Sequence, residues 1–178
     1  TEEYVLCDLG TGARPFGLHV LARKGPRARC TFHVFLSHLH WDHIMGFPFF
    51  PHAYIPGNRI VIYGCHDGIE EALRKQHAAP CFPVDFSGLP AKIEFVKLEP
   101  GRRSRHAGLD VTPKLQLHSG DSYGYRFEHG GKVVVYSTDS EHKTDDAGST
   151  REVVKFFRNA DLVIFDAMYS LADTVSVK

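Results

Sequence analysis

Apolar and polar residues alternate in short runs along most of the chain, and turn-forming residues separate these runs. A period of two is typical of β-strands. The pattern predicts eight strands, over residues 4–7, 31–37, 59–63, 91–98, 109–117, 123–128, 132–137 and 161–165. The last of these runs predicts a buried strand. The sequence His129-Gly130-Gly131 predicts a hairpin between two neighbouring strands.

Helical segments lie between these strands. The pattern predicts helices over residues 17–24, 42–47, 67–78 and 151–159. Asp67 is expected to cap the third of them, because a side-chain oxygen can accept from the first free amides. The aromatic and proline-rich residues 47–56 predict a rigid loop, and the basic residues 101–106 an exposed turn. Runs of strands with interspersed helices predict an α/β (α+β) fold of stacked sheets with helices outside.

Composition restricts the class of protein further. A chain of 178 residues can bury a substantial core, so residues 1–178 are expected to form a single domain. The 21 basic and 21 acidic residues cancel, which disfavours a protein that coats nucleic acid. We expect no membrane segment and a cytoplasmic location, since the chain shows neither a long apolar run nor a leader peptide. The four cysteines have no paired spacing, which indicates reduced thiols.

The segment His38-Leu39-His40-Trp41-Asp42-His43 concentrates four metal-ligand side chains directly after an apolar run. In a packed core these polar groups would lack hydrogen-bond partners, which is costly. Imidazole and carboxylate together suit zinc, with manganese or iron as alternatives. The segment therefore predicts a metal centre.

Spacing divides this segment into two halves. His38 and His40 are two residues apart in a strand-to-loop segment, so they point the same way and can bind one ion. Asp42 and His43 lie beyond the bend and can reach a second ion. Two ions about 3.5–4 Å apart can stabilise both the attacking and the leaving oxygen of a displacement. His118 and Asp139 end later strands, on loops where sites are usually built, and are expected as further ligands.

The pattern resembles the metallo-β-lactamase superfamily from about residue 3 to residue 169. The segment His38-x-His40-x-Asp42-His43 matches the signature motif of that family. Three further elements resemble other motifs of the family. The early turn of the family resembles Asp8-x-Gly10-Thr11-Gly12, and its bridging-aspartate motif resembles Ser137-Thr138-Asp139. The later histidine and Gly-Tyr strand of its phosphodiesterase and ribonuclease Z branch resemble His118 with Tyr123-Gly124-Tyr125.

The resemblance implies an αβ/βα four-layer sandwich with a dinuclear site along one edge. It implies six ligands to two divalent ions, with zinc ahead of manganese or iron: His38, His40 and His118 on one ion, Asp42 and His43 on the other, and Asp139 between them. The implied activity is that of a metallo-hydrolase, in which a bridging hydroxide attacks a phosphodiester. Asp42 would also orient this nucleophile.

Two departures from the family pattern matter. No histidine follows His142, although the family supplies a final one to the second ion. We expect that residue beyond Lys178, and earlier strands before residue 3, so the domain is expected to be truncated at both ends. His142 itself, just after the bridging aspartate, is a candidate proton donor, with a solvated loop residue as the alternative.

Phe165 stands where ribonuclease Z carries a catalytic histidine, and a long basic insertion for tRNA is absent. A small-molecule substrate is therefore expected ahead of tRNA. Hydrolysis of a lactone or thioester, oxidation by a single iron, and a non-catalytic regulatory role remain alternatives. A homodimer is left open as well.

Overall fold

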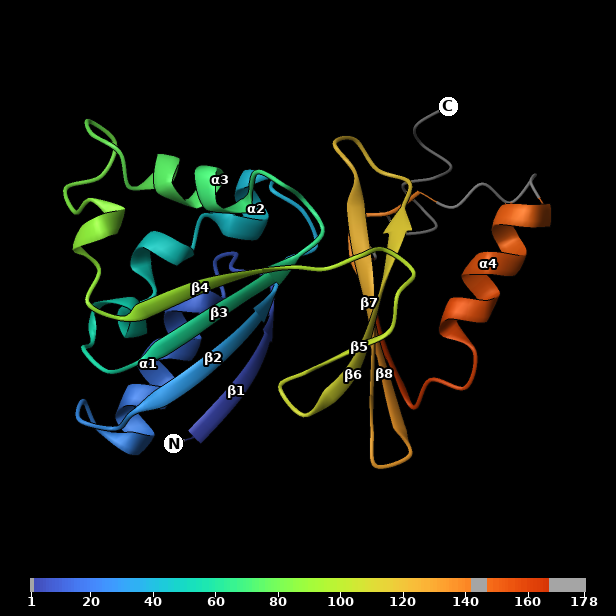
Figure 1. Ribbon diagram of the computed structural model, residues 1–178, viewed down its shortest axis with the longest axis horizontal. Helices are drawn as coiled ribbons and strands as arrows, with labels where there is room; N and C mark the ends of the chain where they lie inside the picture. The colour runs from blue at the N-terminus through green and yellow to red at the C-terminus, as the bar shows by residue number, and fades with distance from the viewer. Residues whose placement is uncertain (1, 142–146, 167–178) are drawn as a thin grey trace, which may run out of the picture.

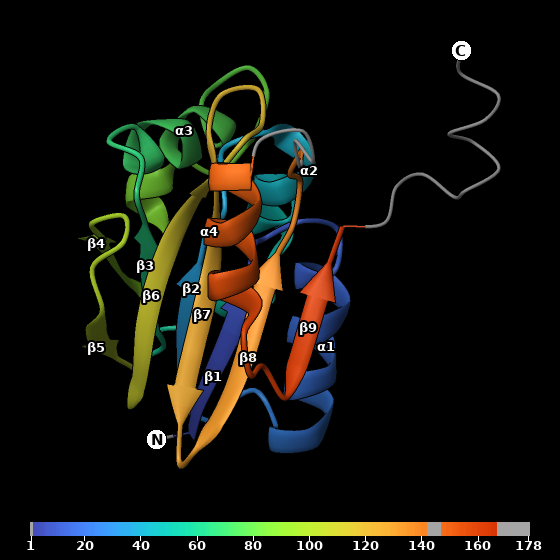
Figure 2. The same ribbon diagram turned by 90° about the vertical axis from the view of Figure 1, so that its right-hand side faces the viewer.

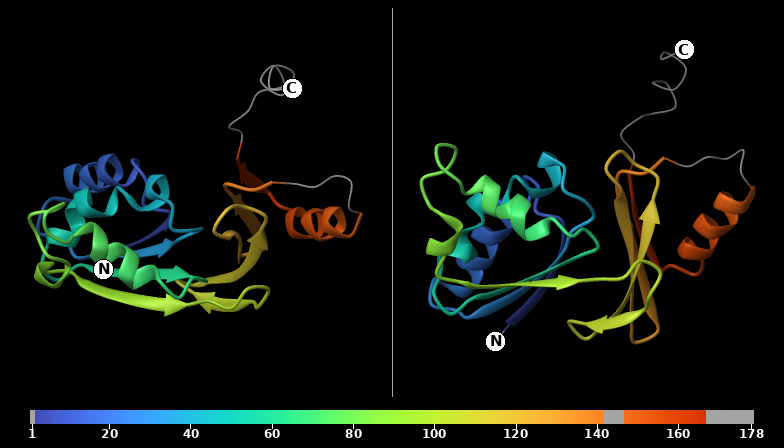
Figure 3. Two further views of the ribbon diagram at one scale, coloured as in Figure 1. Left: turned by 90° about the horizontal axis from the view of Figure 1, so that it is seen from above. Right: turned by 45° about the horizontal axis from the view of Figure 1, so that its top comes forward.

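The computed structural model describes residues 2–141 and 147–166. Two β-sheets face each other, with helices on the outer side of the first sheet and a further helix on the outer side of the second (Figure 1). A view from above shows the same succession of layers (Figure 3). This arrangement confirms the expected αβ/βα four-layer sandwich.

The first sheet is parallel throughout and has the strand order β1-β2-β3-β4. Its strands are β1 (Glu2–Cys7), β2 (Cys30–Phe35), β3 (Arg59–Gly64) and β4 (Lys92–Lys97). The connections contain three α-helices and three short 3-10 helices: α1 (Ala13–Lys24), α2 (Trp41–Ile44), α3 (Ile69–Gln76), η1 (Phe47–Phe49), η2 (Pro51–Tyr54) and η3 (Phe86–Gly88).

The second sheet has the order β5-β6-β7-β8-β9 and is antiparallel except for its last pair. Its strands are β5 (Ser104–His106), β6 (Leu109–Gln116), β7 (Ser122–His129), β8 (Lys132–Ser137) and β9 (Leu162–Phe165). Helix α4 (Ala147–Phe157) connects β8 to β9 and lies over the outer face of this sheet (Figure 2).

Strand β2 is buried on both faces, which fixes the loop that follows it. Phe32 and Val34 belong to the apolar cluster between the first sheet and its helices. Phe35 belongs to the cluster between the two sheets, together with Tyr63 and Tyr125. Because neighbouring residues of a strand point to opposite faces, the short sequence Cys30–Phe35 joins both cores.

Several expected boundaries were wrong. Helix α1 begins at Ala13 rather than at residue 17, since Pro15 is tolerated in a first turn. The expected loop over residues 47–56 contains the two 3-10 helices η1 and η2. Asp67 does not cap α3: Gly68 holds that position, and the Asp67 carboxylate accepts from the Lys97 ammonium at 2.5 Å.

Two further expectations fail in the second sheet. The expected turn over residues 101–106 contains β5, which pairs with the start of β6. The four residues of β9 were expected to be buried, but each is between 42% and 53% exposed. Strand β9 pairs only with β8 among the described strands, and an apolar run by itself does not distinguish an edge strand from a central one. Among the described helices, none combines the length and the apolar composition that crossing a bilayer requires.

Candidate metal centre

The loop with the histidine motif lies between β2 and α2, and both sheets hold its backbone. The Leu36 amide donates to the Tyr63 carbonyl of β3 at 2.9 Å. From the second sheet, the Tyr125 hydroxyl donates to the Leu36 carbonyl at 2.5 Å, and the Tyr123 amide donates to the Ser37 carbonyl at 3.0 Å. The loop is therefore fixed at the edge where the two sheets meet.

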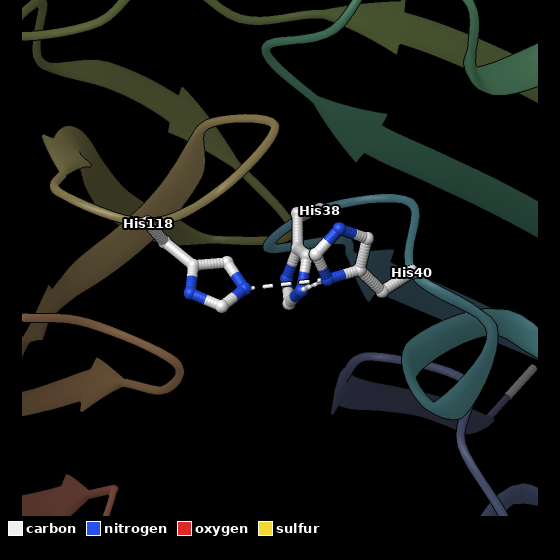
Figure 4. A group of neighbouring side chains, drawn as sticks. All are labelled: His38, His40 and His118. Carbon is white, nitrogen blue, oxygen red and sulfur yellow. Dashed lines mark hydrogen bonds between the residues drawn. The ribbon is translucent and has the colours of Figure 1, made fainter.

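A first group of ligand atoms comes from His38, His40 and His118, all within 4.8 Å of one another. The Nδ1 atom of His40 lies 3.1 Å from the Nε2 atom of His38 and 3.2 Å from the Nε2 atom of His118 (Figure 4). Burial, with the nearby His43 and His40, lowers the pKa of His38 to about 4. The His38 ring is therefore neutral near pH 7, which is the form that binds metal.

A second group is formed by His38, His43 and Asp139. The Asp139 Oδ1 atom is 3.2 Å from His43 Nε2, whereas its Oδ2 atom is 3.6 Å from His118 Nε2 and 3.8 Å from His38 Nε2. Burial acts to raise the pKa of Asp139, but the charge of His43 and the Thr138 hydroxyl keep that pKa below its usual value. An ionised carboxylate thus faces both groups.

Of the remaining predicted site residues, Asp42 lies beside the second group at the protein surface. Asp42 Oδ2 is 3.3 Å from His43 Nε2, and the Asp42 side chain is 72% exposed. Among the described residues it belongs to neither group of three. Its expected role therefore stays a prediction. His142 lies outside the described residues.

Asp8 orients the second group, a role that the sequence did not reveal. Its Oδ2 atom accepts from the Ser37 hydroxyl at 2.8 Å, from His43 Nδ1 at 2.8 Å and from the Tyr136 hydroxyl at 2.7 Å. Its Oδ1 atom accepts from the Ser37 amide at 2.7 Å. Burial acts to lower the pKa of His43, but the bond to Asp8 raises it overall. With Nδ1 held in this way, Nε2 of His43 points at Asp139.

His66 is a second residue that sequence reasoning missed. It follows β3, and its Nε2–H group donates to the carbonyls of Gly120 and Asp121 at 3.3 and 3.1 Å. The first sheet thereby holds the loop that carries His118. The one signal for it in the sequence was a histidine just after a predicted strand that no motif had explained.

The turn that carries Asp8 packs directly against the end of α2. The Gly46 amide donates to the Leu9 carbonyl at 2.7 Å, and a Cβ at Gly46 would lie 2.0 Å from the Gly10 carbonyl oxygen. We expect Gly46→Ala to destabilise the fold by about 3 kcal/mol, because two backbones would have to separate. Thermal unfolding would measure the loss. A Cβ at Gly12 meets nothing within 4 Å, so Gly12→Ala is the matched control. Equal melting temperatures for the two variants would contradict this packing.

Comparison with known proteins identifies the family of the chain. The family described as "Beta-lactamase superfamily domain" matches residues 4–175. Ribonuclease Z from Macrococcus caseolyticus is 29% identical over 129 residues, which cover 70% of this chain and 39% of that protein. The chain therefore spans less than half the length of this curated relative.

Two solved structures share the fold. The short form of human tRNase Z superimposes with a TM-score of 0.63 at 19% identity, covering 96% of this chain and 69% of the other. The metallo-β-lactamase fold protein YhfI from Bacillus subtilis gives a TM-score of 0.56 at 21% identity, covering 89% and 57%. Together with the family match over most of its length, these similarities show that the chain belongs to the metallo-β-lactamase superfamily, as its motifs predicted.

Proposed function

We propose that this metal-dependent hydrolase holds two divalent ions and cleaves phosphodiester bonds. The observation that carries the proposal is the position of the Asp139 carboxylate. One of its oxygens faces His43, and the other faces His38 and His118. A carboxylate in this position can bind two adjacent ions at once, which favours a dinuclear centre over a single ion.

The donor set suits zinc. Imidazole nitrogens and carboxylate oxygens are its usual ligands, with manganese and iron as alternatives. The opposite ring nitrogens also have partners: His38 Nδ1 lies 3.0 Å from the Ser37 hydroxyl, and His43 Nδ1 contacts Asp8. Such outer hydrogen bonds fix the tautomer and leave Nε2 free for metal. We assign His38, His40 and His118 to one ion, Asp42 and His43 to the other, and Asp139 to both.

When bound, the ions would lower the pKa of a water molecule and polarise the phosphoryl group. The residues of the chain supply the orientation. His40 and Asp42 are exposed, so substrate can approach from their side. From its place beside His43, the Asp42 carboxylate can accept a hydrogen bond from the attacking nucleophile and thereby aim it.

The substrate is proposed to be a small phosphodiester. Ribonuclease Z and tRNase Z carry RNA in their names, but the segment between His118 and Asp139 here consists of β7, β8 and their hairpin. It holds no long basic insertion that would grip a tRNA. The near-neutral charge of the chain also gives little general attraction for nucleic acid.

Reconstitution tests the proposal directly. The chain is loaded with zinc or manganese, its ions are counted by mass spectrometry, and it is assayed with bis(p-nitrophenyl) phosphate. We expect about two ions per chain and turnover that a chelator abolishes. One tightly bound iron per chain would contradict the dinuclear site. Turnover of lactones or thioesters alone would contradict the phosphodiester assignment, and turnover of none of them would favour a regulatory domain.

A further inference from the structure

The two candidate ligands on the second sheet come from strands that do not pair with each other. His118 follows β6 and Asp139 follows β8, and β7 lies between these strands (Figure 2). The ladder between β7 and β8 ends at Tyr136, before Asp139 is reached. Yet the Asp139 Oδ2 atom lies 3.6 Å from the His118 Nε2 atom. On the far side of Asp139, the Glu141 amide donates to the Leu117 carbonyl at 2.7 Å, so a backbone bond joins the two segments there.

On the near side of Asp139, a glutamine side chain makes the link across β7. The Nε2–H group of Gln116, the last residue of β6, donates to the carbonyl of Thr138 at 2.8 Å. Gln116 comes shortly before His118 in the sequence, and Thr138 directly precedes Asp139. One side chain therefore joins the two segments that carry these ligands.

Gly124 leaves the space that this link occupies. The Gln116 side chain crosses β7 at Gly124, on the sheet face that α4 covers. A Cβ at Gly124 would lie 3.0 Å from the Gln116 amide carbon, closer still to its Oε1 atom, and 3.1 Å from the Phe156 ring. Carbon atoms prefer separations of about 3.5–4.0 Å, so a larger residue at this position would push the amide away from Thr138. The glycine of the Tyr123-Gly124-Tyr125 segment thus keeps the link intact.

Packing alone does not account for a glutamine at this position. The Gln116 side chain is buried, and its Oε1 atom has no hydrogen-bond partner among the described residues. A buried oxygen without a partner costs stability, and a methionine of similar length would avoid that cost. What a methionine could not supply is the donor to the Thr138 carbonyl.

We propose that Gln116 is a positioning residue that holds the Asp139 carboxylate beside His118. It acts through the Thr138 carbonyl, which fixes the backbone from which the Asp139 side chain extends. The inference rests on the proposed role of Asp139 and His118 as metal ligands, and it adds a residue that controls how well they bind. It does not depend on which bond is cleaved at the metal centre.

Gln116→Met tests the inference, because it keeps the length of the side chain and removes the donor. Zinc affinity of the full chain is measured by titration against a competing chelator, and stability by thermal unfolding of the metal-free chain. We expect zinc affinity to fall about 10-fold, the lower end of the range for residues that orient metal ligands. The melting temperature should stay within about 3 °C, because losing the bond to Thr138 and removing the unpartnered Oε1 oppose each other.

The matched control is Gln76→Met. Gln76 is also buried, on α3, and both polar atoms of its amide lack hydrogen-bond partners among the described residues. It belongs to neither group of candidate ligands, so its replacement should leave zinc affinity unchanged. A loss of less than about threefold in Gln116→Met would overturn the inference, and so would an equal loss in Gln76→Met.

Cobalt(II) in place of zinc separates positioning from folding, because its visible absorption depends on the geometry of its ligands. If Gln116→Met melts more than about 3 °C below the unaltered chain, its cobalt spectrum well below the melting temperature decides. An altered band supports the inference and an unchanged band overturns it. If Gln116→Met does not fold, Gln116→Asn takes its place, because its shorter side chain cannot reach Thr138. A selective zinc loss in a chain without phosphodiester turnover would support this inference and contradict the proposed function, so the two failures are distinguishable.

Discussion

Replacing His38 by alanine should empty the metal centre and abolish hydrolysis. His38 belongs to both groups of ligand atoms, and its side chain is fully buried between them. Its loss removes a ligand of the first ion and a close neighbour of His43 and Asp139, which hold the second ion. We expect bound metal to fall from about two ions per chain to well below one, and kcat/KM to fall roughly 1,000-fold or more, because metal-ion stabilisation contributes several kcal/mol.

A second histidine gives the matched control for this variant. His19 is exposed on α1, and it is absent from both ligand groups. His19→Ala should keep the metal content and the activity of the unaltered chain. The assignment of the centre fails if His38→Ala retains two ions and full turnover while its melting curve shows a folded protein. If it retains one ion, the two halves of the centre are independent of each other.

The sequence could point to candidate ligands because most of them lie on local elements. His38, His40, Asp42 and His43 lie on one short loop, and a single apolar run shows that a strand delivers them. His118 and Asp139 each follow a strand that the alternation of apolar residues identifies. Such signals need no knowledge of the tertiary structure. They explain why stacked sheets with outer helices could be expected beforehand, whereas the four-layer sandwich and the meeting of His118 and Asp139 with the motif were implied by the resemblance to the family.

Features that depend on distant pairs could not be predicted in this way. The hydroxyl of Tyr136 meets the carboxylate of Asp8 across 128 residues of sequence, and nothing local marks either as a partner of the other. The expected burial of strand β9 was wrong for a related reason. Its sequence reads as an interior strand, but its burial depends on which elements lie beside it, and that is a property of the tertiary arrangement.

Asp8→Asn should show how strongly the centre depends on these distant partners. Asp8 has a positive φ of 62°, a conformation that asparagine also adopts readily, so the backbone is not perturbed. The carboxylate accepts at both oxygens: from the Ser37 amide at Oδ1, and from His43 and Tyr136 at Oδ2. Either orientation of an asparagine amide would turn its NH₂ group toward one of these donors. We expect metal affinity to fall about 10- to 100-fold and stability to fall by about 1–3 kcal/mol.

Tyr136→Phe tests whether Asp8 acts by orienting His43 or only by stabilising the packing around its carboxylate. It removes one donor to Asp8 Oδ2 but leaves the bond from His43 in place. Metal affinity should then stay within about threefold of the unaltered chain, with a stability loss near 1 kcal/mol. Zinc titration against a competing chelator measures the affinities, and urea unfolding of the metal-free chains measures the stabilities. If both variants lose stability alike and neither loses zinc, Asp8 supports the fold and does not orient His43. If Asp8→Asn alone has a large loss of zinc affinity, Asp8 orients His43, a ligand of the second ion that lies 35 residues further along the chain.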